Sequence, residues 1–154
     1  MIFSELTLPA NPPGAVHLDR ARIWEGLEQK ARDAVPYVEA ITECRVIENV
    51  SDTVFDREVL LAGSIYVERV WLGAPDRVVF TRTAGPVLGA ITNEILEDAN
   101  GELSLRFQFA LAVAPGTDLP ITEAELATQM VSAYQAAVET TLAAVRARIA
   151  EPVR

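Results

Sequence analysis

The fold of this chain is decided by residues 122–150, TEAELATQMVSAYQAAVETTLAAVRARIA. Thr122 followed by Glu125 is a capping box, in which each side chain satisfies a free backbone N–H group of the first helical turn. No Gly or Pro interrupts the stretch before Pro152, so it predicts a helix about 40 Å long at 1.5 Å per residue. Residues at three- and four-residue spacing give this helix one largely apolar face: Leu126, Met130, Ala133, Ala137, Val138, Thr141 and Val145.

Strand patterns fill most of the chain before this helix. A short strand is predicted over residues 2–8. Asp19 can cap a helix over 20–34, and Pro36 interrupts that helix, leaving one further short turn of helix over 36–41. The gaps between the later strands are only a few residues long, so neighbouring strands must be antiparallel, because a parallel crossover needs a dozen or more residues. Six strands are predicted in this part: 42–50, 53–62, 64–73, 77–83, 89–98 and 102–113.

The last predicted strand shows which side of the sheet is buried. Its apolar residues alternate with mostly polar ones, as in a sheet with one solvated face: Leu103, Leu105, Phe107, Phe109, Leu111 and Val113. The simplest closure is a single α+β domain over residues 1–154, with a curled seven-stranded antiparallel sheet and one long helix over it. If the helix lies across the mouth of the curl, side chains need not fill the space beneath it, and a cavity is expected.

Short motifs accompany this order of elements along the chain. They are Leu18-Asp19, Ile23-Trp24-Glu25-Gly26-Leu27, Lys30-Ala31-Arg32, Cys44-Arg45-Val46, Arg57, Val67-Glu68-Arg69-Val70, Thr92-Asn93, Arg106-Phe107, and Tyr134 with Val138-Glu139-Thr140. Together they resemble the helix-grip fold of the START-like (SRPBCC) superfamily, which includes lipid-transfer domains, plant pathogenesis-related proteins of class 10 and bacterial polyketide cyclases. In particular the chain resembles the AtaL-like branch, whose function is unassigned. The resemblance implies a hydrophobic ligand cavity between sheet and long helix, and supplies no catalytic residues.

Composition narrows the classes of function. The formal net charge of −9, with acidic residues along the whole chain, disfavours binding to nucleic acid or to anionic membranes. The N-terminus lacks the pattern of a secretory signal, and no uncharged stretch is long enough to span a membrane, so a cytoplasmic protein without membrane insertion is expected.

The supply of reactive residues is equally limited. Cys44 and His17 are the only residues of their kinds, which excludes an intrachain disulfide, a cysteine-based metal site and a multi-histidine metal site. The chain has neither a phosphate-binding Gly-rich loop nor a Gly-x-Ser-x-Gly motif. We therefore expect no metal and no cofactor.

One face of the hairpin formed by strands 53–62 and 64–73 is apolar apart from three polar side chains. If Ala62-Gly63 is a two-residue loop, Arg57 lies directly opposite Glu68. A neighbouring Arg should keep a desolvated Glu ionised. A few polar groups among many apolar ones are typical of a ligand pocket, although the ion pair can also serve only to set strand register. The ligand-binding residues predicted on this face are Phe55, Arg57, Val59, Tyr66 and Glu68.

A second hairpin adds two polar candidates. If Asn100-Gly101 is also a two-residue loop, Thr92 and Glu94 face the interior, opposite Phe109 and Phe107. Glu94 then has no predicted partner and could exchange a proton with a ligand, whereas a register error or bulge would turn it to the solvated side. The remaining predicted ligand-binding residues are Phe107, Phe109, Met130 and Tyr134.

Three functions are compatible with these patterns. The first is binding of a small hydrophobic ligand of lipid, polyketide or aromatic type, without covalent chemistry. The second is a cofactor-independent cyclase, dehydratase or isomerase, in which Arg57 holds an enolate or carboxylate and Glu68 or Glu94 shuttles a proton. The third is a protein-interaction module, which the acidic surface permits. A homodimer is also compatible with the sequence, although no feature specifies it.

Overall fold

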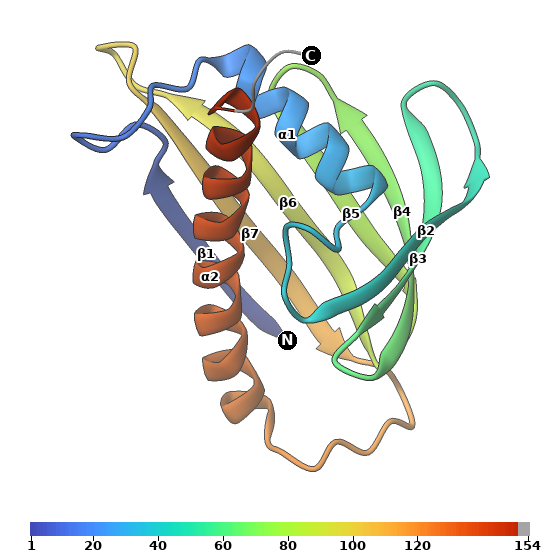
Figure 1. Cartoon of the computed structure of the whole chain (residues 1–154). Coiled ribbons are helices and arrows are strands. Elements are labelled where there is room, and N and C mark those ends of the chain that lie inside the picture. The colour runs from blue at the N-terminus through green and yellow to red at the C-terminus, as the bar shows by residue number, and fades with distance from the viewer. Residues whose placement is uncertain (151–154) are drawn as a thin grey trace.

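A computed structural model describes residues 1–150 and shows one antiparallel sheet with two helices on the same face (Figure 1). Pro152, expected after the end of the long helix, lies outside the described residues. The elements are β1 (Ile2–Pro9), α1 (Arg20–Arg32), β2 (Ile41–Asn49), β3 (Val54–Leu61), β4 (Ser64–Gly73), β5 (Arg77–Ala84), β6 (Val87–Glu97), β7 (Leu103–Val113) and α2 (Glu123–Ala150).

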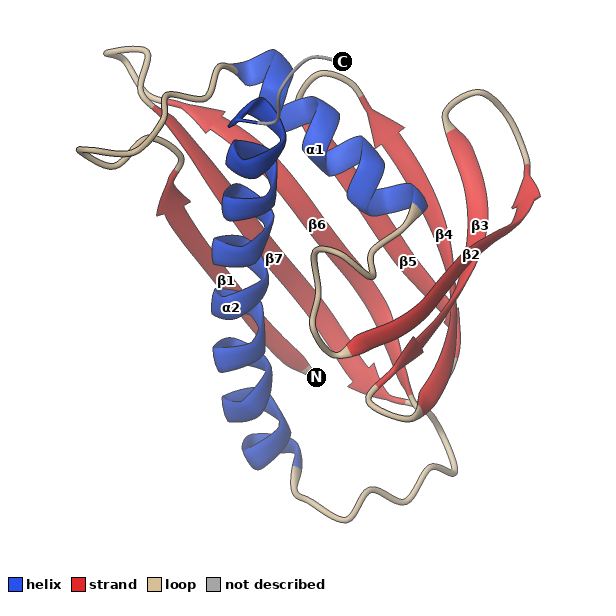
Figure 2. Ribbon diagram, viewed as in Figure 1, coloured by secondary structure: helices blue, strands red, loops and turns tan. Residues whose placement is uncertain are grey.

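The sheet has the strand order β1-β7-β6-β5-β4-β3-β2, and every neighbouring pair is antiparallel. Strands β2 to β7 follow one another through short connections, as the short gaps predicted, while β1 pairs with the last strand β7. The sheet curls so that β2 and β3 come forward toward the side of the helices (Figure 2). The predicted α+β helix-grip class is confirmed.

Helix α1 packs into the curl against β5, β6 and β2. It begins after Asp19, whose Oδ1 accepts a hydrogen bond from Arg22 N at 2.8 Å. Ile23 and Leu27 lie one turn apart on its buried face. Gly26 lets α2 approach closely, because a Cβ atom at this position would overlap Val145 Cγ2.

The residues expected to form a second short helix form hydrogen-bonded turns instead. The backbone N–H groups of Tyr37 and Val38 both donate to Ala34 O at 2.9 Å, and Ile41 N donates to Val38 O at 3.0 Å. Pro36 has no N–H group to donate, and β2 already begins at Ile41, so the segment is too short to continue as a helix.

Helix α2 has two unlike halves. Its C-terminal half carries the buried residues Val138, Thr141, Leu142 and Val145, and α2 packs against β1, β7 and α1. Between residues 123 and 137 no side chain is fully buried. The predicted cap is present in part, since Glu125 N donates to Thr122 Oγ1 at 3.1 Å. The first half of α2 therefore covers the sheet without being packed tightly against it.

Candidate functional site

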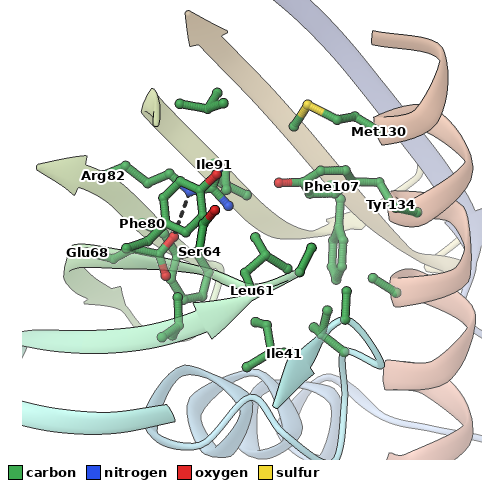
Figure 3. Close-up of a pocket in the computed structure, with 18 of the residues that line it drawn as sticks. Ile41, Leu61, Ser64, Glu68, Phe80, Arg82, Ile91, Phe107, Met130 and Tyr134 are labelled. Atoms are coloured by element: carbon green, nitrogen blue, oxygen red, sulfur yellow. Dashed lines mark hydrogen bonds and ion pairs between the residues drawn. The ribbon is translucent and has the colours of Figure 1, made fainter. Parts of the chain in front are cut away.

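A cavity of about 300 Å³ lies between the inner face of the sheet and the first half of α2 (Figure 3). Its walls are largely apolar and include Val59, Leu61, Phe80, Ile91, Phe107, Leu126 and Met130. Four of its lining residues are solvent-exposed: Ala40, Ala62, Gln129 and Ala133. The cavity therefore reaches the surface between α2 and the loops that flank β2 and β3.

A row of three buried charged side chains crosses the inner face of the sheet. Arg57 on β3, Glu68 on β4 and Arg82 on β5 lie directly opposite one another. Glu68 Oε1 lies 2.8 Å from Arg57 Nη2, and Glu68 Oε2 lies 3.2 Å from Arg82 Nε. Burial opposes ionisation of Glu68, but the charges and hydrogen bonds of the two guanidinium groups outweigh it and hold the pKa of this carboxyl below its usual value. Glu68 is therefore an ionised anchor rather than a proton shuttle.

Arg57 also joins the sheet to the end of α1. Its Nη1 donates to Lys30 O at 3.1 Å and to Ala31 O at 2.9 Å, two carbonyl groups in the last turn of the helix that have no helical partner. The centre of its guanidinium group lies 4.5 Å from the ring centroid of Phe80. The hydrogen bonds of Arg57 thus go to protein groups, so its first role is structural.

Lys30 and Asn93 form a second polar group in the cavity wall. Lys30 is only 5% exposed, and its Nζ donates to Asn93 Oδ1 at 2.6 Å. The ammonium group lies 4.7 Å from the ring centroid of Phe107 and 5.0 Å from that of Phe80. Burial, and then the charge of Arg57, lower the pKa of Lys30 to about 7. Lys30 can therefore exchange a proton near neutral pH.

Two tyrosines add polar atoms to the same wall. Tyr134 points from α2 into the cavity (Figure 3), and its ring stacks on Phe109 with 4.6 Å between centroids. Burial raises the pKa of Tyr134 to about 12 and also raises that of Tyr66, so both are neutral phenols at physiological pH. The guanidinium group of Arg82, which lies across the cavity from α2 (Figure 3), is 4.3 Å from the ring centroid of Tyr66.

The structure brings most of the predicted site residues to one cavity. Phe55 and Phe109 lie in the packed core beside the cavity and do not line it. The first predicted hairpin register is confirmed, because Arg57 lies opposite Glu68 and Val59 opposite Tyr66. That these residues bind a ligand remains a prediction. The predicted residues that line the cavity are Arg57, Val59, Tyr66, Glu68, Phe107, Met130 and Tyr134.

The predicted register of the second hairpin is wrong by one residue. Thr92 pairs with Gln108 and Glu94 with Arg106, so both lie on the outer face of the sheet. Glu94 Oε1 lies 2.6 Å from Arg106 Nη2 there. Because the side-chain period of a strand is two, this shift turns each residue to the other face. Glu94 and Thr92 are thus excluded from the cavity.

The cause of the shift is a longer turn than the two-residue loop predicted. Asp98 N donates to Glu102 O at 3.0 Å, and Asp98 Oδ1 accepts from the N–H groups of Asn100 and Glu102 at 2.9 Å each. Gly101 takes the positive φ of +79° that ends such a three-residue turn. The interior position predicted for Glu94 is therefore occupied by Asn93, opposite Phe107.

Three buried polar residues of the lining were not predicted as site residues: Lys30, Arg82 and Asn93. Lys30 lies three residues after Leu27, on the buried face of α1, and this spacing could have identified it. Arg82 lies two residues after Phe80 on β5, so strand periodicity places both side chains on the inner face of the sheet. Asn93 was missed only through the register error.

Other features of the described residues lie away from the cavity. His17 is exposed in the loop before α1. Residues 1–150 contain no group of three or more His, Cys, Asp or Glu side chains arranged to hold a metal ion. Neither helix in this range is long and apolar enough to cross a membrane.

Solved structures of low sequence identity share this architecture. A START superfamily protein from Mycobacterium smegmatis matches with a TM-score of 0.69 at 12% identity, over 94% of this chain and 97% of that one. The Zhui aromatase/cyclase from a Streptomyces species matches with a TM-score of 0.67 at 15% identity, over 96% of this chain and 94% of that one. XoxI from Bacillus cereus matches with a TM-score of 0.67 at 10% identity, over 94% of this chain and 96% of that one. These likenesses show the START-like fold.

The sequence itself identifies the family. No curated protein matches the chain. The profile of one family, described as acetylaranotin biosynthesis cluster protein L (AtaL), matches residues 4–151. Because this match covers nearly the whole chain, the protein belongs to the AtaL family and carries the START-like helix-grip fold.

Proposed function

We propose that this protein binds one small, largely apolar molecule in the cavity beneath the first half of α2. The observation that carries the proposal is the cavity itself, about 300 Å³ in volume, mostly apolar and open to the surface. Ligand sites in proteins are usually concave, apolar and about 300–1,000 Å³ in volume, with a few polar groups that orient the ligand. This cavity has the same composition, and its volume suits a ligand of one or two rings better than a long lipid chain.

The looseness of the first half of α2 supports the same proposal. A ligand needs a way in, and the exposed residues Gln129 and Ala133 lie on the helix where the cavity meets the surface. The buried C-terminal half holds α2 in place on the sheet. Entry and exit can then occur with little disturbance of the core.

Binding of the neutral fluorescent probe N-phenyl-1-naphthylamine tests the proposal. We expect one probe per chain and a blue-shifted emission, because the probe leaves water. Ala133→Phe should abolish binding by filling the cavity, whereas Ala136→Phe, on an exposed position of α2 that does not line the cavity, should leave it unchanged. Equal binding to both variants, or no saturable binding to the parent protein, would refute the proposal.

A second candidate function is a cofactor-independent cyclase, dehydratase or isomerase reaction in the same cavity. Lys30 favours it, because a buried amine with a pKa of about 7 can take up and return a proton at neutral pH. Lys30 thus replaces the two glutamates predicted for this role, since Glu94 lies on the outer face and Glu68 is held ionised. One protein of the same fold is an aromatase/cyclase by name.

Exchange of the α-protons of benzoylacetone with deuterium, followed by NMR, tests this second function. General acid–base catalysis contributes roughly 10²–10⁴-fold, so the parent protein should accelerate the exchange by at least about 10²-fold over buffer. Lys30→Met should remove the acceleration while leaving binding of the neutral naphthylamine probe intact. Exchange as fast with Lys30→Met as with the parent protein would reject Lys30 as the proton carrier.

A further inference from the structure

We propose that Lys30 and Asn93 form a subsite for one anionic oxygen of the ligand, as found in a carboxylate or an enolate. This inference rests on the proposed binding function and names the chemical class of the ligand: an apolar body with a single acidic oxygen. It is carried by two independent observations, an unpartnered buried amide and an excess of positive charge in the cavity.

The amide of Asn93 offers a donor to the cavity. Asn93 is 1% exposed, lines the cavity, and its Nδ2 is buried without a hydrogen-bond partner among the described residues. The bond from Lys30 Nζ to Oδ1 sets the orientation of the amide, so that Nδ2 is the free end. Nearly all buried donors in proteins have a partner, because an unpaired buried donor loses the hydrogen bond that water would otherwise provide, at a cost in free energy. A ligand oxygen that accepts from Nδ2 removes this cost.

The charge of the cavity favours an anion in the same place. Its ionisable lining side chains are three bases, Lys30, Arg57 and Arg82, and one acid, Glu68, apart from the two neutral tyrosines. The net charge of the wall is thus +2 with Lys30 protonated and +1 with it neutral, inside a protein whose overall charge is −9. Surrounding apolar groups strengthen the attraction between this wall and an anion.

Lys30 is the cation best placed to meet the ligand. Both oxygens of Glu68 are held by Arg57 and Arg82, so these three charges largely satisfy one another. Lys30 Nζ has one hydrogen-bond acceptor in the described residues, Asn93 Oδ1, and an ammonium group can donate three hydrogen bonds. An oxygen between Nζ and Asn93 Nδ2 would accept from both groups.

A set of three isosteric probes tests the subsite: 2-naphthoate, 2-acetonaphthone and 2-isopropylnaphthalene. They share one apolar body and carry an anionic oxygen, a neutral carbonyl oxygen and no oxygen, respectively. A neutral hydrogen bond is worth about 0.5–1.5 kcal/mol and a charge-assisted one roughly twice as much. At 1.4 kcal/mol per tenfold, we expect acetonaphthone to bind about 2–10-fold more tightly than isopropylnaphthalene, and naphthoate at least about fivefold more tightly than acetonaphthone.

Two variants assign the preference to the two side chains. Asn93→Leu should weaken binding of both oxygen-bearing probes, and Lys30→Met should abolish the advantage of naphthoate over acetonaphthone. Both variants should still bind isopropylnaphthalene, which shows that they fold. Thr92→Val, on the outer face of the same strand, is the matched control and should change none of the affinities.

The possible outcomes separate the two proposals. If isopropylnaphthalene and N-phenyl-1-naphthylamine do not bind at all, the proposed binding function fails and this inference fails with it. If the three naphthalene probes bind equally well to the parent protein, the binding function stands and the subsite is refuted. The subsite is also refuted if Asn93→Leu and Lys30→Met keep the full preference for naphthoate.

A second readout follows the proton on Lys30. The charged and titratable groups that influence Lys30 are Arg57, Glu68 and Cys44. Three further groups of this kind line the same cavity: Tyr66, Arg82 and Tyr134. Bound naphthoate should return Lys30 to its charged form. At pH 8, calorimetric titrations in phosphate and Tris buffers should show uptake of nearly one proton by the parent protein and none by Lys30→Met. Absence of uptake in the parent protein would contradict contact between Lys30 and the anion.

Benzoylacetone distinguishes the enolate from the carboxylate. If the subsite accepts an enolate, the ultraviolet spectrum of bound benzoylacetone should show the enolate at a pH at which the free compound is protonated. If benzoylacetone stays protonated while naphthoate shows its preference, the ligand class is narrowed to carboxylates.

Discussion

Among residues 1–150, Glu68 is the only acidic side chain that lines the cavity, and replacing it with Gln removes this charge while nearly preserving the shape of the side chain. Arg57 and Arg82 would then remain buried on either side of a neutral amide. The same network also holds the end of α1, because Arg57 donates to the carbonyl groups of Lys30 and Ala31. We therefore expect Glu68→Gln to lower the free energy of unfolding substantially.

The loss in free energy of unfolding depends on the partners that the guanidinium groups of Arg57 and Arg82 keep in Glu68→Gln. Removing one member of a buried ion pair costs about 3–5 kcal/mol, because the other charge is left uncompensated. Arg57 keeps its two backbone acceptors, whereas Arg82 loses its carboxylate partner and keeps mainly the ring of Tyr66. A loss of about 4 kcal/mol is a large share of the roughly 5–15 kcal/mol that stabilises a typical domain. The free energy of unfolding falls by about 2 kcal/mol per M urea, so a loss of this size should lower the urea midpoint by about 2 M.

The same two strands offer a matched control. Asp56 and Arg69 form the neighbouring cross-strand pair on the outer face, with 2.9 Å between Arg69 Nε and Asp56 Oδ1. Solvent weakens this pair, so Asp56→Asn should move the urea midpoint by less than a quarter of the shift in Glu68→Gln. Equal shifts in the two variants, or an unchanged midpoint in Glu68→Gln, would show that the buried network does not stabilise the fold as argued.

Three further substitutions test other parts of the structure. Folding lowers the pKa of Lys30 from 10.5 to about 7, so the unfolded chain binds more protons than the folded chain between these pH values. From pH 7 to pH 10, urea titrations should therefore show the free energy of unfolding of the parent protein rising by about 4 kcal/mol relative to that of Lys30→Met. Parallel pH profiles of the two proteins would contradict the burial of Lys30. Gly26→Ala should lower the midpoint of thermal unfolding, because overlap with Val145 costs about 1–3 kcal/mol and outweighs a helix-propensity gain of about 1 kcal/mol. A raised midpoint would mean that α1 and α2 can move apart freely. Thr122→Ala should cost about 1 kcal/mol and speed amide exchange in the first turn of α2 only, and unchanged exchange there would show that the cap at Glu125 N is not needed.

The fold could be predicted because its periodicities are local. A strand alternates its faces by backbone geometry alone, so the apolar face of β7 could be identified before any partner strand was known. The short gaps then required antiparallel neighbours. The prediction of a second short helix was wrong, because β2 begins at Ile41 and leaves too few residues for a helix.

Register could be predicted only where the turn was governed by the backbone. Ala62 and Gly63 both have positive φ, 48° and 83°, and form the two-residue loop that places Arg57 opposite Glu68. At Asn100-Gly101 the side chain of Asp98 accepts hydrogen bonds from the backbone N–H groups of Asn100 and Glu102, which stabilises a longer turn. Side-chain capping of this kind competes with the shorter loop, and the dipeptide alone does not show which one forms.

The polar part of the site was the least predictable. A lysine is almost never fully buried, so the position of Lys30 on the apolar stripe of α1 was a weak indication by itself. Its burial depends on Asn93, which lies 63 residues later, and on the rings of Phe80 and Phe107. Such long-range partners become visible only once the sheet register is known.

The unequal halves of α2 separate the residues that hold the helix on the sheet from the residues that shape the cavity. The side chains that hold the helix on the sheet begin at Val138, whereas Leu126, Met130 and Ala133 shape the cavity from positions that are not fully buried. Exchanges at these three positions alter the volume of the cavity at little expense in core packing. If the cavity binds a ligand as proposed, members of the family can diverge in the molecules they accept while keeping the same scaffold, and a designer seeking a new ligand would begin with these three residues.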